Sequence, residues 1–201
     1  MYNLHPSGVF FVIVKTMQFD DIIEAIKKLG HKKPVLIGVE GFGGAGKSTL
    51  SRKLKDELGS SHIIQTDDFV IQEKLALVSP DMECYDLKRL EDSVLIPVTN
   101  GKPALYRKLN WDTFELGEPI EVPPVDYLIV EGITAFHPDI AKYYDFKIWV
   151  DTPIEVATQR GREKDAGTVN AQHWDLWSKN DLAYKAKYHP DEVADAVFTN
   201  G

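Results

Sequence analysis

Cysteine is nearly absent from this sequence, which contains only Cys84 among its 201 residues. One thiol cannot form an intrachain disulfide, and it cannot supply the several thiolates of a cysteine-based zinc site. The six histidines are scattered without the spacing of metal ligands, so no histidine-based metal centre is expected either. This use of cysteine is typical of a reducing compartment, and we therefore predict a cytoplasmic location.

Long apolar runs are also missing. The apolar stretch at residues 9–14, VFFVIV, is too short to cross a membrane. It has neither the positively charged flank nor the small-residue cleavage site of a signal peptide. We therefore expect no association with a membrane, and we predict that this stretch forms an extra strand or precedes the main domain.

Positive charge is in short supply, because 23 Lys and Arg residues face 31 Asp and Glu residues and the net charge is -8. Proteins that bind nucleic acid non-specifically need a basic surface, so no nucleic-acid partner is expected. A phosphate ligand is not excluded, since a few local donors are enough to hold one. The composition predicts nothing about the oligomeric state.

Apolar stretches alternate with helical patterns along the chain, which favours one α/β domain with a mostly parallel sheet covered by helices. A helix over residues 86–98 should break near Pro97, and residues 100–124 should be irregular or form short strands. Further helices are predicted at residues 20–29, 45–58, 153–165 and 171–188. Core strands are predicted at residues 35–40, 62–66, 127–130, 146–150 and 195–200, which makes a five-stranded sheet.

The clearest motif is GFGGAGKS at residues 41–48, which fits the phosphate-loop pattern G-x-x-x-x-G-K-[ST]. It follows a predicted buried strand and opens a predicted helix, whose N-terminus adds a positive dipole end. A plain Gly-rich turn or a G-x-G-x-x-G dinucleotide loop is the alternative, but either leaves Lys47 and Ser48 without a role. The predicted nucleotide-binding residues are Gly41, Phe42, Gly43, Gly44, Ala45, Gly46, Lys47, Ser48 and Thr49.

Two acids follow predicted strands at the edge where α/β sheets bind ligands, namely Asp67 and Glu131. Transfer of a phosphoryl group to a hydroxyl needs a base for that hydroxyl and an acid that holds Mg²⁺. Asp67 suits the first role and Glu131 the second, while Lys47 would bridge the β- and γ-phosphates and Ser48 would ligate Mg²⁺. Glu131 is alternatively a merely solvated acid, and the neighbouring Asp68 is alternatively a helix cap.

The phosphate loop, TDDF, VEGITAF, FKIWVDTP and QRGREKD together resemble the uridine kinase / phosphoribulokinase family of P-loop kinases, over about residues 33–201. The resemblance implies a P-loop NTPase fold, ATP and Mg²⁺ as cofactors, and a small-molecule acceptor, with a nucleoside as the first choice. It assigns Asp67 as the general base and Ser48 and Glu131 as Mg²⁺ ligands. It also implies a small helical lid at about residues 157–175 of a kinase domain that spans residues 33–201. We predict that residues 1–32 form an N-terminal extension, a strand and a helix, packed on the core of this domain.

The predicted lid contains a cluster of basic residues in the motif QRGREKD. Arg160 and Lys164 lie four residues apart and would share one helix face, from which both could neutralise charge in the transition state. The resemblance adds Arg162. A solvated basic face paired with nearby acids is the alternative. The sequence departs from the family here, because Lys164 stands where an arginine is expected and a second arginine pair is missing.

The acceptor region also departs from the family, which often has a Tyr-Asp-aromatic triplet where this chain has LNW at residues 109–111. Tyr85 and Asp86 could instead be a hydrophobic staple and a helix cap, and Trp111 could fill the core. The stripe formed by Trp174, Trp177 and Tyr184 is expected to pack rather than to bind a ligand. Candidate acceptor contacts are Asp67, Tyr85, Asp86, Arg107 and Trp111.

Two other functions compete with a small-molecule kinase. A nucleotide hydrolase or switch of the GTPase type would need an N-K-x-D guanine motif, and the sequence contains none. A family member that binds nucleotide without catalysis is compatible with the altered lid and the LNW triplet.

Overall fold

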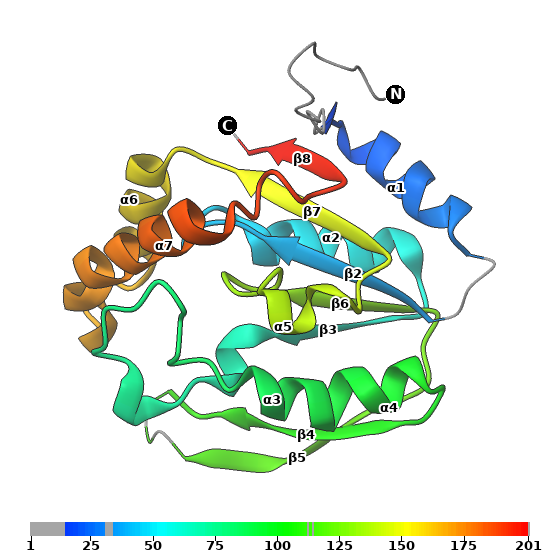
Figure 1. The fold of residues 1–201 in the computed structure, drawn as a ribbon, viewed down its shortest axis with the longest axis horizontal. Helices are drawn as coiled ribbons and strands as arrows, with labels where there is room; N and C mark the ends of the chain where they lie inside the picture. Colours follow the sequence, from blue (N-terminus) through cyan, green and yellow to red (C-terminus); the bar gives the residue numbers. More distant parts are fainter. Residues whose placement is uncertain (1–14, 31–33, 112, 114, 201) are drawn as a thin grey trace.

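A computed structural model describes residues 15–30, 34–111, 113 and 115–200 (Figure 1). Its centre is a sheet in the order β1-β8-β7-β2-β6-β3, with every neighbouring pair parallel. The predicted α/β fold is confirmed, although the sheet has six strands instead of five because a short N-terminal strand pairs with β8. The strand expected at residues 9–14 lies outside the described residues. The strands are β1 Lys15–Thr16, β2 Val35–Glu40, β3 Ser61–Gln65, β6 Tyr127–Glu131, β7 Phe146–Asp151 and β8 Ala196–Thr199.

The predicted helices form close to their expected bounds: α1 Phe19–Lys28, α2 Lys47–Leu58, α6 Ile154–Lys164 and α7 Trp174–Tyr188. A one-turn helix, α5 Pro138–Ala141, and 3₁₀ turns η1 Thr66–Phe69, η2 Gln72–Lys74 and η4 Val169–His173 lie in the connections. In α1 the acids Asp20 and Asp21 lie in the first turn, Lys27 and Lys28 lie in the last, and the isoleucines between them are buried. Charges placed in this way complement the helix dipole, so α1 is anchored on the core by its apolar face.

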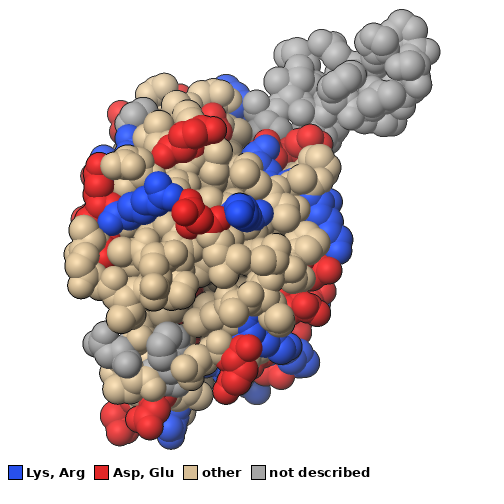
Figure 2. All heavy atoms as spheres, turned by 90° about the vertical axis from the view of Figure 1, so that its left-hand side faces the viewer, with Lys and Arg blue, Asp and Glu red and all other residues tan. Residues whose placement is uncertain are grey.

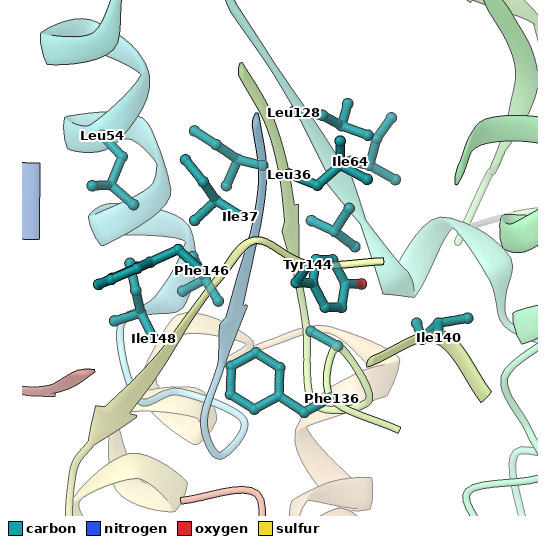
Figure 3. Packing of buried hydrophobic residues seen from close by; sticks show 14 of the residues in the cluster. Leu36, Ile37, Leu54, Ile64, Leu128, Phe136, Ile140, Tyr144, Phe146 and Ile148 are labelled. Atoms are coloured by element: carbon teal, nitrogen blue, oxygen red, sulfur yellow. The ribbon is translucent and has the colours of Figure 1, made fainter. Parts of the chain in front are cut away.

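β2 is the central strand, and each of its residues is buried. Leu36 and Ile37 point to opposite faces of the sheet, so that Ile37 packs on the side of α2 with Leu54 and Leu36 lies on the side of Tyr144 (Figure 3). Only glycine fits at Gly38, since a Cβ there would lie 2.7 Å from the Phe136 ring. A rigid central strand therefore ends where the phosphate loop begins.

The predicted helix break near Pro97 is wrong. The chain stays helical through α3 Leu87–Leu90, a π-helical turn η3 Glu91–Leu95 and α4 Ile96–Thr99. The wide turn, in which the Ile96 amide donates to the Glu91 carbonyl, restarts the helix just before the proline. Proline is tolerated at the start of a helix because its missing N–H is not needed there.

The strands β4 Ala104–Leu109 and β5 Leu116–Val122 pair antiparallel as a hairpin, in agreement with the prediction of short strands. The hairpin is held against η1 by Tyr106, whose ring stacks on Phe69 with 5.6 Å between the ring centroids. Trp111 lies two residues beyond the end of β4. The hairpin thus brings a distant part of the sequence to the segment that carries Asp67.

The strands of the main sheet all end on the side where α6 and α7 lie together (Figure 1, left). Figure 2 shows this side of the molecule, on which acidic and basic side chains are interspersed. Among the described residues, the helices are each too short or too polar to cross a membrane.

Candidate active site

The phosphate loop, residues 41–48, connects β2 to α2 and packs directly against α6. Gly46 is the N-cap of α2 and adopts φ 102°, a left-handed conformation that favours glycine. At Gly44, a Cβ would lie 2.0 Å from the carbonyl oxygen of Ala157 on α6. Lys47 folds back over the loop, and its Nζ donates to the Phe42 carbonyl at 2.9 Å. The two glycines and Lys47 therefore hold the loop in this conformation without a ligand.

The rear of the loop is braced by residues that follow β7 and β8. Thr152 Oγ1 donates to the Ala45 carbonyl at 3.1 Å, and Asn200 Nδ2 donates to the same carbonyl at 2.7 Å. Phe42 packs edge-on against Trp149, with ring centroids 5.5 Å apart. These contacts hold the loop in place through the Ala45 carbonyl and the Phe42 ring.

Ser48 and Glu131, the two predicted Mg²⁺ ligands, are in contact. Ser48 Oγ donates to Glu131 Oε1 at 2.7 Å, and Gln65 Nε2 donates to the same oxygen at 2.8 Å. A hydroxyl and a carboxylate are the hard oxygen donors that Mg²⁺ prefers, and the ion usually takes its remaining ligands from phosphates and water. The donor set therefore fits a Mg²⁺ ion shared with a nucleotide. Among the described residues, no cluster of three or more His, Cys, Asp and Glu side chains is arranged to hold a metal by itself.

Asp67 lies in η1, directly after β3, and its side chain opens into the space in front of the phosphate loop. Tyr85 Oη donates to Asp67 Oδ1 at 3.4 Å. Desolvation by the surrounding protein, together with the nearby Glu131 carboxylate, raises the pKa of Asp67 above its usual value. A raised pKa makes the carboxylate a better proton acceptor near neutral pH.

The segments of Asp67 and Glu131 pack against each other through the residues beside them. A Cβ at Gly132 would lie 1.7 Å from Thr66 Oγ1, so only glycine allows this approach. The glycine of the VEG motif thus sets the spacing between the candidate base and the candidate Mg²⁺ ligand.

A cavity of about 290 Å³ lies in front of the loop and collects the key side chains. It brings together residues from the phosphate loop, η1, the segment before α3, the hairpin, β6 and α6. The predicted residues in its wall are Gly43, Gly44, Lys47, Ser48, Asp67, Tyr85, Trp111, Glu131 and Lys164.

α7 contributes an acid to the cavity that the sequence analysis missed. Asp181 is almost completely buried, and its Oδ2 accepts a hydrogen bond from the Gly43 amide at 2.8 Å. Burial raises the pKa of Asp181 to about 6, against the smaller opposing effects of the Gly43 bond and of Lys47. One carboxylate therefore ties α7 to the phosphate loop.

The chain is similar in sequence and in fold to known proteins. The chain is 28% identical to the uridine kinase of Lactobacillus helveticus over 152 residues, which are 67% of this chain and 69% of that one. It is 33% identical to the pantothenate kinase of Streptococcus mutans over 148 residues, 63% of this chain but 47% of that longer protein. No family model matches the chain. The fold is similar to that of a protein described as a possible uridine kinase from Bacillus stearothermophilus, with a TM-score of 0.71, 17% identity, and coverage of 90% of this chain and 96% of that one.

The chain therefore resembles the uridine kinases in sequence, and its fold is that of the P-loop NTPases. It spans about half the length of the related pantothenate kinases.

Three of the predicted site residues, Asp86, Arg107 and Arg160, do not line the cavity. Asp86 is the N-cap of α3, where its Oδ1 accepts from the Arg89 amide at 3.0 Å. Arg107 lies on the exposed part of β4. Arg160 Nη1 donates to the Asn200 carbonyl at 3.4 Å and, unlike Lys164, does not line the described cavity. Of these two cations of the predicted lid, Lys164 therefore lines the cavity, while Arg160 lies beside Asn200, which braces the loop.

The three aromatic residues of α7 that the sequence analysis grouped, Trp174, Trp177 and Tyr184, have different surroundings in the structure. Tyr184 is fully buried, and Trp174 packs on α6, where a Cβ at Gly161 would lie 2.2 Å from its ring. Trp174 Nε1 also donates to Asp165 Oδ2 at 2.9 Å. Trp174 and Trp177 both line the cavity as well, so the expectation of pure packing is right only for Tyr184.

Proposed function

We propose that this protein transfers the γ-phosphate of MgATP to a hydroxyl group of a small metabolite, most plausibly a nucleoside. The observation that supports this most is the meeting of Lys47, Asp67 and Glu131 in one cavity. A hydrolase needs to position only water, whereas this cavity has room for an organic acceptor beside the loop.

In the proposed reaction, Asp67 accepts the proton of the acceptor hydroxyl as that oxygen bonds to the γ-phosphorus. The bond from the γ-phosphorus to the β,γ-bridging oxygen breaks, and ADP leaves with that oxygen. Lys47 neutralises the β- and γ-phosphate oxygens from the loop, and Lys164 approaches them from the lid. A bound Mg²⁺, held by Ser48 and Glu131, would supply further neutralisation of the phosphate charge.

The nucleoside is proposed from two considerations. Tyr85, Trp111 and Trp177 place aromatic rings in the cavity wall, and such rings can stack on a planar base. The relative with 69% of its length aligned is a uridine kinase, whereas the pantothenate kinases align over only about half of theirs. Uridine is therefore the first acceptor to test, and pantothenate the second.

The test is incubation of the purified protein with Mg²⁺ and ATP against pools of nucleosides, sugars and vitamin precursors, followed by mass spectrometry. We expect one class of acceptor to gain a single phosphate. Release of ADP and phosphate with every acceptor unchanged would instead indicate a hydrolase. Binding of ATP without either product would indicate a family member that has lost catalysis.

A further inference from the structure

The charged groups around the cavity are unequally divided between the nucleotide and the acceptor. Among the described residues that line it, the cationic side chains are Lys47 and Lys164. Lys47 belongs to the phosphate loop, and Lys164 to the lid that would close over the phosphates. No cation of the described wall is therefore left for an anionic group on the acceptor.

Four carboxylates share the same wall, namely Asp67, Glu131, Asp165 and Asp181. Glu131 accepts from Ser48 and Gln65, and Asp165 accepts from the Trp174 indole. The two others, Asp67 and Asp181, lie at the front of the loop. Asp181 Oδ2 accepts from the Gly43 amide, and the Asp181 side chain also lines the cavity.

The neighbour of Asp181 is an independent sign that a polar ligand belongs here. Asn180 is only 4% exposed and lines the cavity. Its Nδ2 donates to the Leu77 carbonyl at 3.1 Å, but its Oδ1 is buried without a partner. A buried polar atom without a partner is costly, and a hydroxyl or amino group of a ligand would satisfy it.

We infer, on the basis of the proposed function, that the acceptor is an uncharged molecule rich in hydrogen-bond donors, and that Asp181 selects it. Asp181 and the Asn180 carbonyl oxygen accept hydrogen bonds from acceptor groups that do not react. An anionic acceptor would meet the triphosphate, Asp67 and Asp181 together, and like charges at such short range repel one another. Nucleosides and free sugars satisfy this requirement, whereas carboxylate and phosphate-bearing acceptors do not.

The experiment compares acceptors that are matched in shape but differ in charge. The pairs are uridine-5-carboxamide with 5-carboxyuridine, pantothenol with pantothenate, and glycerol with glycerate. Binding is measured by calorimetry with Mg²⁺ and a non-hydrolysable ATP analogue, and transfer is measured separately with MgATP. We expect at least one neutral compound to bind 100-fold more tightly than its anionic partner.

The role of Asp181 is tested by Asp181→Asn, which keeps an oxygen for the Gly43 amide and removes the charge. We expect the neutral-to-anionic ratio of binding constants to fall at least tenfold. Asp175→Asn, on the exposed surface of the same helix, should leave the ratio unchanged. An unchanged ratio in Asp181→Asn would overturn the role of Asp181.

The same data separate this inference from the proposed function. Tight binding of an anionic member of any pair, or binding of none of the six compounds, would overturn the uncharged acceptor. Binding of a neutral acceptor without phosphoryl transfer would support the inference and remove the proposed function. The wild-type comparison depends on no variant, so a failure of Asp181→Asn to fold would not affect it.

Discussion

The adjacent residues Asp67 and Asp68 have very different environments in this protein. Asp67 opens into the cavity, whereas Asp68 is buried, faces Lys108 at 3.7 Å, and has its pKa raised to about 6 by burial. The Arg89 guanidinium also donates to the Asp68 carbonyl at 2.8 Å. One residue of the pair is therefore placed for chemistry, and the other ties η1 to the hairpin.

Replacing Asp67 tests the proposed base. Asp67→Asn keeps the shape of the side chain but cannot accept the hydroxyl proton, so kcat should fall by about 10²- to 10⁴-fold. The dissociation constant for ATP should stay within about twofold, because Asp67 is not part of the loop. Steady-state kinetics and calorimetry measure the two quantities, with the exposed Asp139→Asn as a control. Full turnover in Asp67→Asn would remove it as the base.

Replacing Asp181 has a consequence for stability that depends on pH. Its pKa is 3.8 in the unfolded chain and about 6 in the fold, so the folded state binds more protons between these values. The contribution of Asp181 to the free energy of unfolding therefore falls as pH rises through this window, by at most about 3 kcal/mol. Asp181→Asn should raise Tm more at pH 7.5 than at pH 5, measured by calorimetry. An equal gain at both values would contradict the raised pKa.

The residues that sequence reasoning found and missed differ in where they lie. Asp67 and Glu131 each follow a strand of the parallel sheet, and strand ends share one edge, so their meeting could be predicted. Asp181 lies inside a helix whose apolar and polar residues are not segregated onto opposite faces, and its partner is a backbone amide 138 positions away. Backbone partners leave no pattern in the sequence, so this contact could be found only in the fold.

At the scale of elements, α6 and α7 act as one unit because Trp174 lies across Gly161. The same ring is held by the hydrogen bond to Asp165, which neighbours the lid lysine Lys164. The position of the lid lysine thus depends on close packing between two helices.

Filling the space at Gly161 tests this dependence. In Gly161→Ala the new methyl group would overlap the Trp174 ring, and the resulting shift should cost about 1–3 kcal/mol of unfolding free energy. It should also lower kcat, because Lys164 would move with the end of α6. Gly117→Ala serves as the control, since its Cβ would meet only an ordinary contact at 3.6 Å. Thermal unfolding and kinetics of both variants measure the effects, and equal behaviour would show that the helices separate without cost.

At the scale of the molecule, ATP should stabilise the whole fold because it binds only the folded loop. At a concentration 100-fold above its dissociation constant, ATP with Mg²⁺ should add about 2.7 kcal/mol to the free energy of unfolding. The rise in Tm should disappear in Lys47→Ala, whose unliganded Tm should remain close to that of the wild type. A persistent ATP-dependent shift in Lys47→Ala would mean that the nucleotide binds elsewhere.

The architecture was more predictable than its details. Buried strands such as Val35–Glu40 and amphipathic helices such as α1 can be predicted because their apolar residues form a regular pattern over a short stretch of sequence. The continuation of the helix through Pro97 did not, because the π-helical turn that permits it depends on local hydrogen bonding rather than on apolar spacing. The departure of Asp86 and Arg107 from the cavity likewise depends on how the hairpin packs against η1.

The brace behind the phosphate loop has a practical consequence for handling the protein. Asn200 holds the Ala45 carbonyl, and a Cβ on Gly46 would lie 2.2 Å from the Asn200 amide nitrogen. Any affinity tag or fused domain attached after this residue therefore begins next to the phosphate loop. A tag placed before residue 15 would instead lie near the start of β8, because Lys15 pairs with Ala196. Kinetic constants obtained with a C-terminal tag should be compared with those of the cleaved protein before they are interpreted.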